Sequence, residues 1–153
     1  MQVWQLMSTD VVTLDAETTL DVADDLMKLK RIRHLPVVRE GELVGLVTQR
    51  DLFRAGLSTV LQFRRGVQKE WLEKIKVQEI MTRALITCGP DMEIDEAVAR
   101  MLDHRIACLP VVSGGKLVGL LSETDCLGYL RRILEIADIR KRLAEEERAV
   151  DVS

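Results

Sequence analysis

Hydrophobic and polar positions follow the same order in both halves of this 153-residue chain. Each half begins with a short aliphatic run, at 11–14 and at 85–87, which predicts a strand. Apolar residues then return every three to four positions, as in 20–27, which predicts an amphipathic helix. Two further apolar runs around a Gly turn predict a hairpin, and a following hydroxyl residue predicts a helix start. We therefore expect a mixed α/β (α+β) fold in which one unit occurs twice.

The repetition is also visible in the residues themselves. Residues 35–48 read LPVVREGELVGLVT and residues 109–122 read LPVVSGGKLVGLLS, and they align without a gap at an offset of 109 − 35 = 74. The same offset relates Asp51 to Asp125. A period this long is unlike that of solenoid arrays, which stack several short repeats. Two copies instead predict a pair with pseudo-two-fold symmetry, with functional residues near the seam between them.

These patterns divide the chain into repeat one (1–55), a linker (56–76), repeat two (77–130) and a C-terminal helical tail (131–153). The linker is charged and irregular, and its sequence is compatible with a long loop or with a loop plus a helix. Residues 127–150 carry a partial apolar stripe beside charged positions, which predicts a helix. That stripe needs an apolar partner, either on the same protomer or on a second one.

Composition and charge exclude several classes of protein. The formal net charge is −3 and aromatic residues make up 3% of the chain, so we expect no surface for nucleic acid. No run of about 18 apolar residues predicts a membrane span, and the N-terminal MQVWQLMSTD lacks the regions of a secretory signal. Three cysteines without a Cys-x-x-Cys pair fit a reducing cytoplasm and predict no metal site. Because common catalytic motifs are absent, we do not expect an enzyme.

Two hydroxyl–carboxylate pairs, Thr48 with Asp51 and Ser122 with Asp125, occupy equivalent places in the two repeats. Each pair suits a helix start, where the two side chains satisfy backbone N–H groups. The carboxylate can also accept hydrogen bonds from both hydroxyls of a ribose, while the helix N-terminus favours a nearby phosphate. The two interpretations are compatible, and the residues alone leave both open.

The ordered set of motifs closely resembles the CBS domain. It runs M-[ST]-x-x-V-V-T, then LPVV, then G-x-L-V-G followed by two hydrophobic residues and [ST]-x-x-D, over residues 3–55 and 77–130. Two such units resemble a tandem CBS pair, or Bateman module. The resemblance implies two β-α-β-β-α repeats that pack through their sheets with pseudo-two-fold symmetry. It also implies adenine nucleotides or adenosyl compounds bound in two clefts between the repeats, and regulation rather than catalysis.

The resemblance further implies which residues line these clefts. Arg33 and His34 precede LPVV in repeat one, where family members often face the phosphates of a ligand, and Ala107 and Cys108 take these places in repeat two. An arginine and a histidine suit a phosphate; the alternative is a solvated Arg33 beside a half-buried His34. We expect one basic cleft, and a second for adenosine-like or uncharged-tail ligands or for none. The basic cleft would combine Ser8, Arg33, His34, Ser122 and Asp125, and the second Thr82, Ala107, Cys108, Thr48 and Asp51, with Val12, Ile86, Pro36 and Pro110 as further ligand-binding candidates.

The sequence therefore predicts a stand-alone CBS pair that senses a ligand in the cytoplasm and regulates an unidentified partner protein. The expected regulatory ligand is AMP, ADP, ATP or adenosylmethionine, with no catalytic cofactor. A homodimer is expected, because each repeat carries an amphipathic helix and the tail carries a further apolar stripe. The alternative from another class is a dimerisation scaffold that binds no ligand and uses its hydroxyl–carboxylate pairs only as helix caps.

Overall fold

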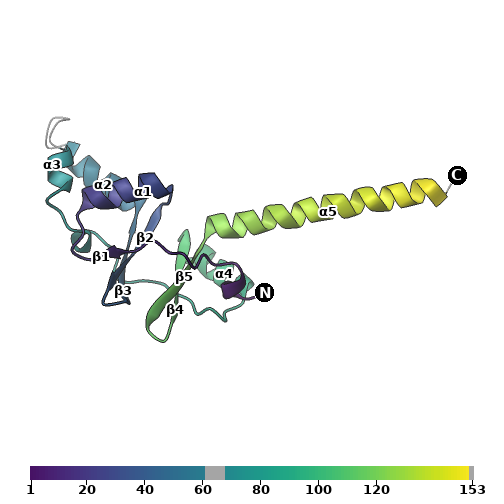
Figure 1. Ribbon diagram of the computed structural model, residues 1–153, viewed down its shortest axis with the longest axis horizontal. Helices are drawn as coiled ribbons and strands as arrows, with labels where there is room; N and C mark the ends of the chain where they lie inside the picture. The colour runs from purple at the N-terminus through teal and green to yellow at the C-terminus, as the bar shows by residue number, and fades with distance from the viewer. Residues whose placement is uncertain (61–67, 152–153) are drawn as a thin grey trace.

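The computed structural model describes residues 1–60 and 68–151 and contains the predicted order of elements except for the first strand of repeat two (Figure 1). A one-turn 3₁₀ segment lies at the start of each repeat, at 3–5 and at 77–79, and a short helix at 68–72 lies in the predicted linker. The elements are η1 (Val3–Gln5), β1 (Leu14–Asp15), α1 (Leu20–Lys30), β2 (His34–Arg39), β3 (Glu42–Thr48), α2 (Gln49–Val60), α3 (Gln68–Leu72), η2 (Val77–Glu79), α4 (Ile94–His104), β4 (Cys108–Ser113), β5 (Lys116–Ser122) and α5 (Glu123–Asp151).

One five-stranded sheet runs through both repeats in the order β1-β2-β3-β5-β4. Each repeat contributes an antiparallel hairpin, β2–β3 or β4–β5, and the two hairpins meet where Glu42 on β3 pairs with Lys116 on β5. Both hairpins carry a register shift at the same place, between Val37 and Val38 in repeat one and at the equivalent positions in repeat two. The two hairpins are therefore related by the predicted pseudo-symmetry even in the position of this register shift.

The first residues of each repeat, which we call the crossing segment, pair with a strand of the other repeat. Ser8 exchanges two backbone hydrogen bonds of 2.9 Å with Leu120 on β5, and Thr82 pairs in the same way with Leu46 on β3. Val3 of η1 is consequently buried in the core of repeat two, and Val77 of η2 in the core of repeat one. Each repeat thus completes its core with residues from beyond its own boundaries.

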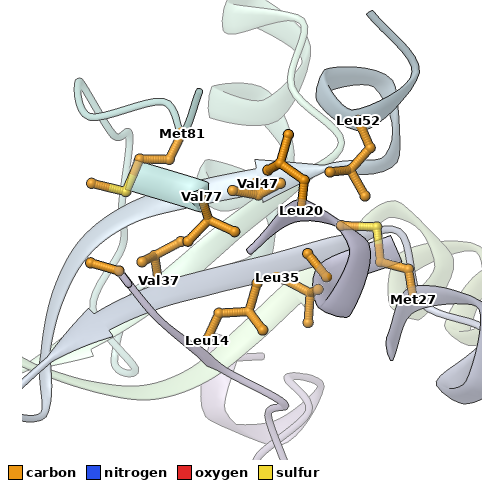
Figure 2. Close-up of a cluster of buried hydrophobic side chains, with 11 residues drawn as sticks. Leu14, Leu20, Met27, Leu35, Val37, Val47, Leu52, Val77 and Met81 are labelled. Carbon is orange, nitrogen blue, oxygen red and sulfur yellow. The ribbon is translucent and has the colours of Figure 1, made fainter. Parts of the chain in front are cut away.

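Figure 2 shows the core of repeat one, in which apolar side chains from the sheet, α1, α2 and η2 converge. The labelled residues are Leu14, Leu20, Met27, Leu35, Val37, Val47, Leu52, Val77 and Met81. The core of repeat two is built on the equivalent plan around Leu109, Val111 and Leu121, all fully buried. Burial of apolar area in these two clusters is the main stabilising contribution to the fold.

Three elements differ from the sequence prediction. The run at 85–87 forms no strand, and the nearest sheet pairing is a single parallel bridge between Cys88 and Val111. The first strand is Leu14–Asp15 rather than 11–14. The tail is no separate unit, because α5 runs from Glu123 to Asp151 without a break.

The linker contains a helix, α3, which supports a loop plus a helix over a simple loop; residues 61–67 of the predicted linker lie outside the described residues. Among the helices of residues 1–60 and 68–151, none is long and apolar enough to cross a membrane.

The close approach of the crossing segment to β5 requires a glycine at position 119. A Cβ added there would lie 2.5 Å from Sδ of Met7 and 3.1 Å from the backbone oxygen of Ser8. We predict that Gly119→Ala lowers the free energy of unfolding by about 1–3 kcal/mol, because it overpacks this contact. Urea denaturation measures the change. The control is Gly89→Ala, where an added Cβ would meet nothing within 4 Å, and an equal loss in both variants would contradict the packing argument.

Candidate functional site

Two cavities lie where the repeats meet, and each is lined by residues from both repeats. The smaller has a volume of about 240 Å³ and the larger about 1160 Å³. Of the residues predicted to bind a ligand, Ser8, Val12, Arg33, His34, Ser122 and Asp125 line the smaller cavity. Thr48, Asp51, Thr82, Ile86, Ala107, Cys108 and Pro110 line the larger, which Arg33 and His34 also border. The two groups of residues that the sequence analysis assigns to separate clefts therefore line separate cavities, except that Arg33 and His34 border both.

Pro36 is the exception among these candidates. Its side chain is fully buried in β2, opposite Leu46 on β3, and it is not among the residues that line either cavity. Its counterpart Pro110 is equally buried but borders the larger cavity. Pro36 alternates with the core residues Leu35 and Val37 along β2, so it lies on the opposite face of the sheet, and a ligand contact for it stays a prediction.

The hydroxyl–carboxylate pairs form a capping box at the start of α2 and of α5. Oδ2 of Asp51 accepts hydrogen bonds from the N–H and from Oγ1 of Thr48, both at 2.8 Å, and Oγ1 accepts the N–H of Asp51 at 3.3 Å. Ser122 and Asp125 repeat this arrangement with distances of 2.8, 2.6 and 3.3 Å. Capping is therefore confirmed in both repeats. Oδ1 of each aspartate takes no part in the capping box, so one oxygen of each carboxylate can still accept hydrogen bonds from a ligand.

The crossing segment brings a further hydroxyl to the smaller cavity. Oγ of Ser8 lies 3.5 Å from Oδ1 of Asp125, at the long limit for a hydrogen bond. A ligand hydroxyl placed between these two atoms would find an acceptor on one side and a donor on the other. The smaller cavity therefore offers polar groups suited to a polyhydroxyl compound such as a ribose.

Arg33 forms an ion pair across the seam. Its guanidinium lies 3.4 Å from Oε1 of Glu123 at the start of α5, with side-chain exposures of 57% and 48%. Such exposed pairs contribute little to stability, so this arginine can exchange its partner at small cost. Because Arg33 borders both cavities, it can reach an anion bound in either one.

His34 is half-buried beside Arg33. Burial, reinforced by the positive charge of Arg33, holds the pKa of His34 below its usual range. The ring is therefore neutral at pH 7 and offers one donor and one acceptor. It is suited to hydrogen bonding rather than to charge pairing, so the cationic contribution at this place comes from Arg33.

Cys108 borders the larger cavity but has no reactive character. Burial, with a smaller contribution from Glu123, raises the pKa of this thiol to about 12. A protonated, buried thiol is a poor nucleophile and a poor metal ligand. Within residues 1–60 and 68–151, no three His, Cys, Asp or Glu side chains are arranged to hold a metal ion.

Comparison with known proteins agrees with this geometry. A family model described as the CBS domain matches residues 3–58 and 77–132, which together make up more than half of the chain. The chain belongs to the CBS domain family. Among curated proteins, CBS domain-containing protein YhcV of Bacillus subtilis is 34% identical over 119 residues, which cover 78% of each chain.

Solved structures of CBS pairs resemble this one closely. The CBS domain pair of protein MJ0100, in complex with 5′-methylthioadenosine and S-adenosyl-L-methionine, is 27% identical with a TM-score of 0.72, covering 85% of this chain and 95% of that one. CBSX2 in complex with AMP is 26% identical with a TM-score of 0.71, covering 86% and 97%. Both neighbours thus bind adenosine compounds.

The likeness to enzymes is partial. Inosine-5′-monophosphate dehydrogenase of Thermoplasma acidophilum is 38% identical over 120 residues, but these residues are 77% of this chain and only 21% of that enzyme. The likeness is therefore to a short part of the enzyme. It gives no ground for assigning the activity of the whole enzyme to this CBS pair.

Four arginines at the cavities of this CBS pair were not predicted from the sequence. Arg50, Arg54 and Arg105 line the larger cavity and Arg31 the smaller. The expectation that only one cleft would be basic is therefore wrong. Arg50 could have been found, because it stands inside the TQRD motif between Thr48 and Asp51. Arg31 and Arg105 carried a subtler signal, namely their own offset of 105 − 31 = 74.

Proposed function

We propose that this CBS pair binds adenine nucleotides or adenosyl compounds in its two cavities and thereby regulates a partner protein in the cytoplasm. One observation carries the proposal: both cavities are lined by residues of both repeats. In each cavity, one repeat contributes a hydroxyl–carboxylate pair at the start of a helix, and the other contributes the hydroxyl of its crossing segment, Ser8 or Thr82. The adenosine compounds held by MJ0100 and CBSX2 support it. Three free cysteines fit the reducing compartment.

The proposed ligand contacts follow from the chemistry of each group. Asp51 and Asp125 accept hydrogen bonds from ribose hydroxyls, and Val12 and Ile86 form apolar walls for the base. Arg33 and His34 contact phosphate oxygens. Ser8 and Thr82 are further polar contacts close to the ribose. A ligand held in this way touches both repeats at once.

Contact with both repeats gives the ligand a means of regulation. A phosphate that takes Arg33 away from Glu123 replaces a contact between the repeats with a contact to the ligand. The ligand therefore has different affinities for two arrangements of the repeats, which is the requirement for shifting their populations. The role that we propose is accordingly regulatory rather than catalytic.

We also propose that the chain is a homodimer. Large apolar side chains remain exposed on α1, α2, α4 and α5, most of them on α5. Exposed apolar patches of this extent mark interaction surfaces, and identical chains usually pair with closed two-fold symmetry. A dimerisation scaffold without a ligand is the competing proposal, since the observed capping boxes suffice for it.

A thermal-shift panel separates the two proposals. At a ligand concentration of about 100 times Kd, binding stabilises the fold by roughly 2.7 kcal/mol, which raises the Tm of a domain this size by about 5–10 °C. We expect this rise for at least one of AMP, ADP, ATP and adenosylmethionine, with inosine as the control for the base. If no adenine compound raises the Tm above experimental scatter at millimolar concentration, the sensor proposal fails and the dimerisation scaffold remains.

A further inference from the structure

Helices α1 and α4 both end at an arginine in the left-handed conformation. Arg31 has a φ of 54° and Arg105 a φ of 53°. Around Arg31, the N–H of Arg31 donates to Lys28 and the N–H of Ile32 to Met27, at 3.4 and 3.0 Å. Arg105 and Ile106 repeat both hydrogen bonds in repeat two, at 3.2 and 3.0 Å. Both ends are therefore Schellman motifs, whose left-handed residue is most often glycine.

An arginine in this conformation is less stable than a glycine would be, because its Cβ crowds the following carbonyl. The chain itself uses the alternative elsewhere. In the hairpin turns, repeat one has Glu40 at a φ of 52° and repeat two has Gly114 at a φ of 57°, again at the offset of 74. At the helix ends, by contrast, both repeats carry arginine. Strained residues of this kind gather at functional sites.

Both arginines border the cavities, one for each. Arg31 lines the smaller cavity with Arg33, Asp10 and Asp125, and Arg105 lines the larger. In the larger cavity the neighbouring charged residues are Arg33, Arg50, Arg54, Asp51 and Glu123.

The guanidinium groups of Arg31 and Arg105 form no ion pair with a carboxylate of the described residues. Both side chains are exposed. A cation at the mouth of a cavity, without a partner carboxylate, is suited to binding an anion.

We propose that Arg31 and Arg105 are phosphate-binding residues, one in each cavity, and that they set the preference for phosphorylated over unphosphorylated adenosine ligands. The inference rests on the proposed function and deepens it. It explains why a strained arginine stands at both helix ends, and why both cavities are basic although only repeat one carries Arg33 and His34.

Replacement by glycine tests this directly, because it removes the guanidinium and the backbone strain together. In the full chain, Arg31→Gly and Arg105→Gly are each compared with wild type by calorimetry, with adenosine, AMP and ATP as ligands. We expect the affinity for AMP or ATP in the affected cavity to fall about tenfold or more, while the affinity for adenosine stays within twofold. The Tm without ligand should equal or exceed that of wild type.

Glu40→Gly is the matched control, since it relieves the same strain outside both cavities and should change no affinity. Arg31→Lys keeps the charge and should retain part of the preference for AMP over adenosine. Unchanged affinity for AMP and ATP in both glycine variants would overturn the inference, as would an equal loss for adenosine and AMP. If wild type binds no adenine compound, the proposed function fails as well; if it binds and the variants keep its preference, only this inference fails.

Discussion

Truncation after Gly128 is expected to convert the proposed homodimer into a monomer whose cavities are still formed. In the sequence, the apolar stripe of the tail could equally have docked on its own repeats or crossed to a second chain. The structure argues against docking on the same protomer, because every side chain described from 130 to 145 is exposed. Figure 1 shows α5 extending away from the body of the molecule as one long helix.

The size of the effect follows from what α5 carries. Six large apolar side chains between 130 and 143 are 43–56% exposed, namely Leu130, Ile133, Leu134, Ile136, Ile139 and Leu143. Burial of such side chains against a second copy contributes about 25 cal/mol for each Å² of apolar surface. An interface of standard size buries about 1,600 Å² in total, and no other helix of the described residues offers a comparable run of apolar groups.

Light scattering after size-exclusion chromatography measures the outcome. The full chain should have twice the mass of one 17.3 kDa protomer, and the truncated chain the mass of a single shorter one. Ligand binding should survive truncation, because the residues that line both cavities end at Leu127. In the full chain, Leu134→Glu should weaken the dimer, while Arg142→Gln, on the charged face, should not. A truncated chain that remains dimeric would place the interface on α1 and α2, where Val22, Leu29 and Phe53 are exposed.

Most helices and strands, and the equivalence of the two repeats, were predictable because both can be recognised in the sequence without knowing which residues are in contact. Amphipathic periodicity marks a helix such as α4, and an offset of 74 residues marks equivalent positions without any knowledge of the fold. The crossing of Ser8 to Leu120 and of Thr82 to Leu46 is different. It depends on long-range pairing, which no local pattern contains, and only the family resemblance led to the composite cavities.

The charge of the cavities was mispredicted for a physical reason. Arg33 and Ala107 stand before equivalent strands, and the difference between these two residues alone predicts one basic and one uncharged cleft. Arg31 and Arg105 look like ordinary solvated arginines at a helix end, because their left-handed backbone is not visible in the residue type. Pro36 is fully buried and lines neither cavity, which its position in a motif does not reveal.

Replacing Asp125 with alanine is expected to weaken adenine-ligand binding in the smaller cavity by about 100-fold or more, for nucleoside and nucleotide alike. A carboxylate that accepts two ribose hydroxyls loses two charge-assisted hydrogen bonds of about 1.5–3 kcal/mol each. The loss should be independent of phosphate, because the ribose is common to all these ligands. Asp51→Ala should have the same effect in the larger cavity, where Asp51 takes the equivalent place. Calorimetry with adenosine and AMP measures both.

Stability separates ribose binding from capping. Asp125 accepts the N–H of Ser122 at 2.8 Å, so its loss also removes a cap and should cost about 1 kcal/mol in the free energy of unfolding. Asp125→Asn keeps an oxygen for that N–H, and should restore most of the stability but little of the affinity, since the charge is gone. Asp95→Ala is the matched control, an exposed acid in the first turn of α4 that lines neither cavity. If the alanine variant loses stability while both the alanine and the asparagine variants keep the affinity of wild type, the carboxylate is a cap alone and the ribose contact is wrong.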